Sequence, residues 1–327
     1  MKIAVVGCGA VGSYYGAKLC LDGHEVHFLL RSDHDAVKSN GVRIISADGG
    51  FTVHPRCARN PDEIGQADLV IIGLKTTAND RFATLLPPLV SNSTAVLTLQ
   101  NGLGNEEAIA KLFPEKLILG GLCFVCLNRT QPGVIHHMAH GKILMGEFGN
   151  RPQQRTHDIA SMLQHAGIPC QVSDDLAQAH WEKLAWNIPF NGLGVASAAG
   201  VEAVTSGELE SSSPLHPCLT TDRLLSDPQW REQVVGLMDE VIAAARRLGH
   251  PMPDNLQERL LKNTLEMGAY RSSSVVDFER GDCVEIESLF GEPLRCASSA
   301  GINMPRLARL YEVLKAIASR RNTGATG

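Results

Sequence analysis

The chain has 327 residues, of which 44% are hydrophobic and 20% are charged, and its formal net charge is -5 at pH 7. The length predicts two domains, and the composition is typical of a globular protein. The net negative charge argues against nucleic acid and against an anionic membrane as partners. No apolar run approaches the ~20 residues of a membrane span. A strand begins at Lys2 with no leader before it, so we expect a cytoplasmic protein.

The nine cysteines are scattered and lie mostly within apolar segments. Their odd number and irregular spacing fit reduced, buried thiols better than a disulfide framework. Cys123 and Cys126 lie three residues apart in a predicted strand, so their side chains point to opposite faces. We therefore expect no metal site and no redox centre.

The stretch 1–19 combines an apolar strand, Lys2–Val6, with a glycine motif and a helix. Gly7 allows a sharp turn, Gly9 lets a pyrophosphate approach the backbone, and Gly12 lets the helix pack closely on the strand. The helix N-terminus offers N–H groups to phosphate. A glycine turn without a ligand is the alternative, but the order of strand, glycines and helix favours dinucleotide binding. The predicted cofactor loop consists of Gly7, Cys8, Gly9, Ala10, Val11 and Gly12.

A second strand, 26–30, ends immediately before Arg31 and Ser32. In dinucleotide-binding folds an acid near this point binds a ribose 2′-hydroxyl, whereas an arginine accommodates a 2′-phosphate. Arg31 therefore favours NADP over NAD. Asp33 lies close enough to keep NAD as an alternative.

Two further apolar runs, 67–75 and 94–99, predict strands that are buried on both faces of a parallel sheet. Ligands bind at the carboxyl ends of such strands. Lys75 ends the first run and Asn101 follows the second, so we expect both beside the cofactor; an Asn-Gly turn is the alternative at Asn101. Shorter strand patterns occupy 121–127, 134–138 and 142–148, and 42–58 resembles a hairpin.

From residue 174 onward the pattern becomes helical. Asp227-Pro228 begins a helix with apolar residues at helical spacing, and two further helices are predicted over 285–300 and 305–320. The sequence therefore predicts an α/β Rossmann-type dinucleotide-binding domain, 1–173, followed by an all-α domain, 174–327.

Near this domain change, Lys183, Asn187 and Asn191 recur at a spacing of four, which places them on one stripe of a helix. A lysine among apolar neighbours can donate a proton or stabilise an oxyanion. A solvent-facing stripe is the alternative. Pro189 interrupts the helical hydrogen bonds and is expected to re-aim Asn191.

Taken together, the ordered motifs resemble the ketopantoate reductase (2-dehydropantoate 2-reductase) family. They are GxGxxG at the N-terminus, Lys75, Asn101-Gly102, K-x-x-x-N-x-x-x-N from Lys183, and S-S-x-x-x-D-x-x-x-G-x-x-x-E-I ending at Ile286. The resemblance implies NADPH-dependent reduction of 2-dehydropantoate to pantoate, on the path to pantothenate and coenzyme A. It also implies an active site between a Rossmann domain and a helical domain.

The resemblance further implies roles for individual residues. Lys183 would be the general acid and Glu285 would bind a substrate hydroxyl and order the site. Substrate would be hydrogen-bonded by Asn187, Asn191, Ser273 and Asn101. Cofactor contacts would include the loop 7–12, Arg31, Lys75, Asn101 and Glu285.

Asp282 and Glu287 depart from the family pattern, which leaves other 2-keto acids open as substrates. A non-catalytic NADP(H)-binding sensor is a further alternative. The expected partner is a small-molecule 2-keto acid, and the sequence leaves a homodimer open.

Overall fold

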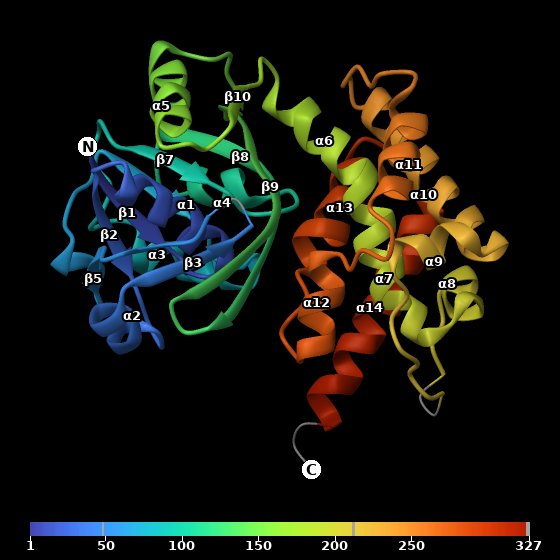
Figure 1. Ribbon diagram of the computed structural model, residues 1–327. Helices are drawn as coiled ribbons and strands as arrows, with labels where there is room; N and C mark the ends of the chain where they lie inside the picture. The colour runs from blue at the N-terminus through green and yellow to red at the C-terminus, as the bar shows by residue number, and fades with distance from the viewer. Residues whose placement is uncertain (48, 211–212, 325–327) are drawn as a thin grey trace. The chain divides into compact units, whose positions relative to one another are not determined.

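The computed structural model describes residues 1–47, 49–210 and 213–324. The chain separates into two compact units, Met1–Ala179 and His180–Gly327. The first contains a sheet with helices and the second is built from helices (Figure 1). This confirms the predicted fold class. The predicted boundary, 173/174, lies just before α6 (Leu176–Asn187), whereas the division between the compact units falls inside that helix.

The sheet of the first unit has the strand order β4-β3-β9-β8-β7-β6-β1-β2-β5, and β10 pairs with β9. Its strands are β1 Lys2–Val6, β2 Glu25–Leu29, β3 Val42–Ser46, β4 Phe51–Val53, β5 Arg56–Ala58, β6 Leu69–Ile72, β7 Ala95–Thr98, β8 Ile118–Gln131, β9 Val134–Glu147 and β10 Cys170–Val172. The helices are α1 Ala10–Leu21, α2 His34–Asn40, α3 Phe82–Leu85, α4 Asn105–Ala110 and α5 Gln154–His165, with short turns η1 Pro61–Glu63, η2 Thr76–Arg81 and η3 Glu115–Leu117.

The central strands are buried on both faces, as their apolar runs predict. In β6, Leu69 and Ile71 belong to one apolar cluster, and Val70 and Ile72 belong to another. Alternate side chains of a strand point to opposite faces, so these clusters are the cores on the two sides of the sheet. The neighbouring strands β7, β6, β1 and β2 pair in parallel, which brings their carboxyl ends to one edge.

The second half of the sheet differs from the prediction. The patterns at 121–127, 134–138 and 142–148 indicate three short strands, but the structure has two strands, β8 and β9, paired as one long antiparallel hairpin. Register shifts of the kind that β-bulges produce interrupt this pairing at three points. Within the predicted hairpin at 42–58, β3 and β4 pair in antiparallel, whereas β5 pairs with β2. Residue 48 lies outside the described residues.

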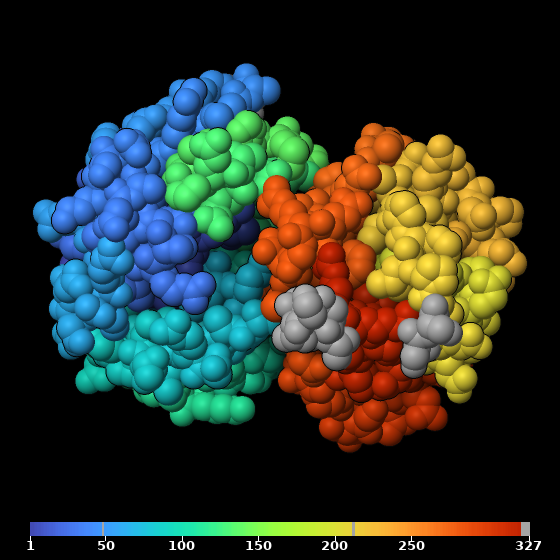
Figure 2. All heavy atoms as spheres, turned by 90° about the horizontal axis from the view of Figure 1, so that it is seen from below, coloured from blue at the N-terminus to red at the C-terminus, as the bar shows by residue number. Residues whose placement is uncertain are grey.

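The helical unit is organised around a π-helical turn, η4 Ile188–Leu193, which follows α6. The other elements are α7 Gly194–Ala196, η5 Ser197–Ala199, α8 Val201–Ser206, α9 Thr221–Ser226, α10 Pro228–Arg247, α11 Leu256–Glu266, α12 Ser273–Arg280, η6 Glu287–Gly291, α13 Glu292–Ser299 and α14 Pro305–Gly324. The turn η4 is buried throughout and contacts α9, α10, α12, α14 and η6. α10 also packs on α14, and yellow and red segments of this unit lie side by side in Figure 2.

The start of α10 follows the predicted chemistry. The Asp227 side chain accepts hydrogen bonds from the backbone N–H groups of Gln229 and Trp230, at 2.9 and 3.1 Å. Pro228 occupies the first helical position, where its missing N–H is not needed. The predicted helix over 305–320 is confirmed as α14, and the one over 285–300 is divided between η6 and α13.

Candidate functional site

The predicted site residues fall into two groups, one in each unit. In the first unit they follow four parallel strands: Gly7 follows β1, Arg31 follows β2, Lys75 follows β6 and Asn101 follows β7. Because these strands are neighbours and run in parallel, all four residues lie along one edge of the sheet. Arg31 and Lys75 are exposed there.

The glycine loop has the packing that its motif predicts. A Cβ atom at Gly7 would lie 2.3 Å from the backbone nitrogen of Leu74, and one at Gly12 would lie 2.3 Å from the carbonyl oxygen of Gly7. A Cβ at Gly9 would have no heavy atom within 4 Å. Gly7 and Gly12 therefore permit close backbone packing, whereas Gly9 leaves the backbone open at the N-terminus of α1. An open backbone at a helix N-terminus fits a pyrophosphate.

Cys8 lies inside the same loop. Its Sγ donates to the carbonyl oxygens of Val5 and Leu29, at 3.5 and 3.6 Å. Burial, together with the nearby Cys57 and Asp33, raises the pKa of the Cys8 thiol well above its ordinary value. The side chain therefore stays neutral and adds no negative charge beside the loop.

A chain of side-chain hydrogen bonds connects the segments that follow β6 and β7. Thr98 donates to Gln100 (2.9 Å), Gln100 donates to Asn79 in η2 (2.8 Å), and Asn79 donates to Asn105 in α4 (2.9 Å). Asn105 then donates to the backbone carbonyl of Asn101, at 3.1 Å. These contacts hold the segment after Lys75 and the segment of Asn101 together. These contacts were not predicted from the sequence, although amide side chains that follow two neighbouring strands are a recognisable signal of such a network.

In the second unit, Lys183 and Asn187 lie on α6, half-buried and buried respectively. The regular helix ends at Asn187, and the predicted interruption around Pro189 takes the form of the π-helical turn η4. Asn191 lies in that turn and is only 2% exposed. The stripe predicted from a spacing of four therefore extends as regular α-helix only to Asn187.

Asn191 and Ser273 are in contact. The Asn191 side-chain oxygen accepts hydrogen bonds from the Ser273 hydroxyl (3.2 Å) and from the backbone N–H of Ser274 (3.0 Å). Both serines lie in the first turn of α12, where N–H groups lack helical acceptors, so Asn191 serves as a cap from another segment. Ser273 itself is exposed.

Glu285 is buried and lies just before the π-helical turn η6, which contacts η4. Glu287, which departs from the family pattern, has two partners in the structure. Its carboxylate accepts a hydrogen bond from Tyr311 at 2.6 Å and pairs with Arg295 at 3.0 Å. Burial raises the pKa of Glu287, but the hydrogen bonds from Tyr311 and Arg295 lower it more, so its pKa lies below the ordinary value. Glu287 therefore acts as an anion between helices.

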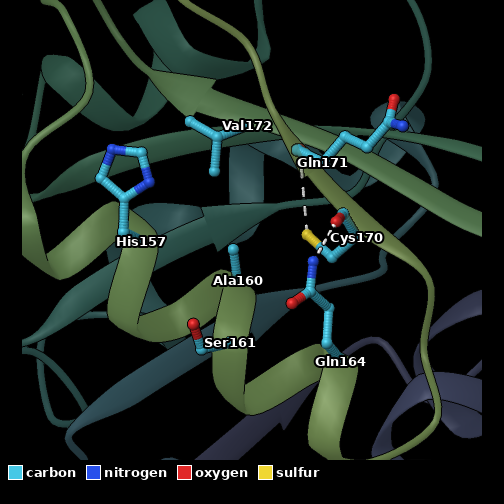
Figure 3. Close-up of a pocket in the computed structure, with 7 residues that line it drawn as sticks. All are labelled: His157, Ala160, Ser161, Gln164, Cys170, Gln171 and Val172. Carbon is cyan, nitrogen blue, oxygen red and sulfur yellow. Dashed lines mark hydrogen bonds between the residues drawn. The ribbon is translucent and has the colours of Figure 1, made fainter.

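One hollow of the surface contains none of the predicted residues. It lies between α5 and β10 and is lined by His157, Ala160, Ser161, Gln164, Cys170, Gln171 and Val172 (Figure 3). Gln164 points toward β10, and its side-chain amide donates to the carbonyl oxygen of Cys170, at 2.6 Å. Burial raises the pKa of the Cys170 thiol to about 12, so this cysteine is not a nucleophile near neutral pH.

Within 1–47, 49–210 and 213–324, His, Cys, Asp and Glu form no group of three that is suited to a metal ion. In the same part of the chain, no helix is both long and apolar enough to cross a bilayer.

Known proteins match the chain along nearly its whole length. The family model "Ketopantoate reductase PanE/ApbA" matches residues 3–150, and "Ketopantoate reductase PanE/ApbA C terminal" matches residues 209–318. A 2-dehydropantoate 2-reductase of Nostoc sp. is 40% identical over 99% of this chain and 97% of that protein. The crystal structure of 2-dehydropantoate 2-reductase from Geobacter metallireducens GS-15 has a TM-score of 0.87 and 42% identity, covering 96% of this chain and 99% of that one.

A more distant structure shares the fold alone. The ternary structure of D-mandelate dehydrogenase with NADH and anilino(oxo)acetate has a TM-score of 0.84 at 20% identity, covering 99% of both chains.

Proposed function

The chain belongs to the ketopantoate reductase family, and from this premise we propose that it reduces 2-dehydropantoate (ketopantoate) to pantoate with NADPH, a step toward pantothenate and coenzyme A. Family membership makes it an oxidoreductase. The observation that supports this choice of substrate is the 40% identity to a 2-dehydropantoate 2-reductase over 99% of the chain. Such coverage includes both the glycine loop and the helical unit.

The first unit supplies the residues that would hold the cofactor. The open backbone at Gly9 would receive the pyrophosphate, and the exposed guanidinium of Arg31 would bind the 2′-phosphate. Lys75 and Asn101, at the ends of β6 and β7, would line the nicotinamide end. When bound, the reduced nicotinamide supplies a hydride.

The helical unit supplies the residues proposed to act on substrate. Reduction of a ketone leaves negative charge on its oxygen, and the Lys183 ammonium would neutralise that charge and donate the proton. Glu285 would bind a substrate hydroxyl, and Asn187 and Ser273 would hydrogen-bond the substrate. Because Asn191 is buried and accepts from Ser273, we propose that it also fixes the position of that serine.

The test is NADPH consumption by the purified protein with ketopantoate, beside pyruvate and 2-ketoisovalerate. We expect turnover with ketopantoate far above that with the other two acids. Lys183→Ala should lower turnover by about 10²–10⁴-fold, the usual contribution of a general acid. Lys262→Ala, an exposed lysine of α11 in the same unit, is the matched control and should keep wild-type turnover.

Each alternative has its own outcome. Turnover with a different 2-keto acid would assign a related reductase. Tight NADP(H) binding without turnover of any keto acid, unaffected by Lys183→Ala, would assign a sensor instead.

A further inference from the structure

The acid that keeps NAD as an alternative cofactor is already engaged within the protein. Asp33 follows Arg31 by two residues and lies immediately before α2, and its side chain is only 9% exposed. One carboxylate oxygen accepts from the Ser32 hydroxyl at 2.9 Å, and the other pairs with the Arg129 guanidinium at 2.5 Å. Both oxygens of Asp33 therefore have partners inside the first unit.

Arg129 reaches Asp33 from a distant part of the sheet. It lies near the end of β8, and β7, β6 and β1 stand between β8 and β2 in the strand order. The long β8–β9 hairpin brings it there, because the hairpin tip at Gly133 lies against α2. A Cβ at Gly133 would be 3.2 Å from a side-chain carbon of Val37. The β8–β9 hairpin therefore determines where Arg129 lies.

We propose that Arg129 is a specificity-determining residue for the cofactor. By pairing with Asp33, it keeps that carboxylate from binding a ribose 2′-hydroxyl and from repelling a 2′-phosphate. With the pair intact, the charge of Arg129 offsets that of the buried Asp33 carboxylate, so the charge of Arg31 remains to favour a phosphate dianion. The inference rests on the proposed preference for NADPH and explains how the chain achieves it despite an acid near the position that NAD enzymes use.

A neighbouring ion pair provides the matched control. Asp35, two residues further along, pairs with Arg59 at 2.6 Å, but its side chain is 83% exposed. Exposed pairs contribute little, because water already screens both charges. Replacing Arg59, which follows β5, breaks the Asp35–Arg59 pair and removes an arginine charge near this segment without uncovering a buried carboxylate.

The experiment is equilibrium titration of NADPH and NADH into the purified protein, followed by intrinsic fluorescence, without substrate. Arg129→Gln should weaken NADPH binding about tenfold more than NADH binding, since the unpaired carboxylate then faces the phosphate. Asp33→Asn combined with Arg129→Gln should regain most of that loss. Arg59→Gln should leave the NADPH/NADH ratio within about twofold of wild type.

An unchanged affinity ratio in Arg129→Gln would overturn the inference. So would a loss that persists in full in the double variant, because Arg129 would then act on the phosphate directly. Thermal unfolding shows whether each variant is folded. If Arg129→Gln does not fold, Asp33→Asn alone should keep the NADPH preference. A loss of that preference in Asp33→Asn would contradict the inference. A wild-type protein that binds NADH more tightly would refute the proposed cofactor itself, which is a separate result.

Discussion

The glycine loop has two proposed roles: Gly12 allows α1 to pack closely, and Gly9 leaves an open backbone for the pyrophosphate. Replacing each glycine by alanine, one at a time, separates these roles. A Cβ at Gly12 would lie 2.3 Å from the Gly7 carbonyl oxygen, well inside the 3.0 Å that real Cβ contacts essentially never cross. The clashing atom belongs to the backbone, so α1 itself must move. A Cβ at Gly9 meets no atom, and the backbone there is extended.

Gly12→Ala should therefore mainly lower stability, whereas Gly9→Ala should mainly weaken cofactor binding. Gly12→Ala should lower the free energy of unfolding by about 1–3 kcal/mol, the usual cost of overpacking a buried contact. Gly9→Ala should change it by no more than about 0.5 kcal/mol, as for a surface substitution. It should nevertheless weaken NADPH binding about tenfold or more, since the methyl group occupies the open backbone where the pyrophosphate is proposed to lie.

Urea unfolding measures the first quantity, and fluorescence titration with NADPH measures the second. Wild-type affinity in Gly9→Ala would refute pyrophosphate binding at this backbone. Wild-type stability in Gly12→Ala would refute the packing argument.

Three further predictions concern the helical unit. Asn191→Ala should cost about 1–3 kcal/mol in urea unfolding, because the buried N–H of Ser274 loses its acceptor; Asn191→Asp keeps an oxygen there and should cost less. Asp227→Ala removes the cap of α10 and should cost about 1 kcal/mol by the same assay, and Asp227→Ser should recover most of it. Tyr311→Phe should raise the depressed pKa of Glu287 toward its ordinary value. A carboxylate with a lowered folded pKa adds stability above its unfolded pKa of about 4.3, so the difference from wild type should shrink as pH falls below that value; a difference that grows in acid would contradict this reasoning.

The first unit was predictable where local pattern and global fold agree. The run ending at Lys75 forms a strand buried on both faces, and the glycine motif folds as a strand–loop–helix, because each is specified by adjacent residues. The long β8–β9 hairpin was not predictable from its three apolar patterns. Its bulges add residues to one strand and shift the alternation, so a continuous strand has the pattern of separate ones.

In the candidate site, sequence spacing identifies residue types but not their partners. Arg129 lies almost one hundred positions from Asp33, and only the folded hairpin brings them together. The contact of Asn191 with Ser273 spans a similar separation and depends on the π-helical turn, which no periodicity in the sequence indicates.

The π-helical turn η4 also sets how this chain tolerates changes in length. Hydrogen bonds in such a turn skip one residue more than in an α-helix. Because the turn accommodates one extra residue, deleting a single residue between Ile188 and Leu193 would let it close as ordinary α-helix while the later side chains keep their facing. Adding one residue to the regular helix α6 would instead rotate every later side chain by roughly 100° and misalign the five helical segments that pack against the turn.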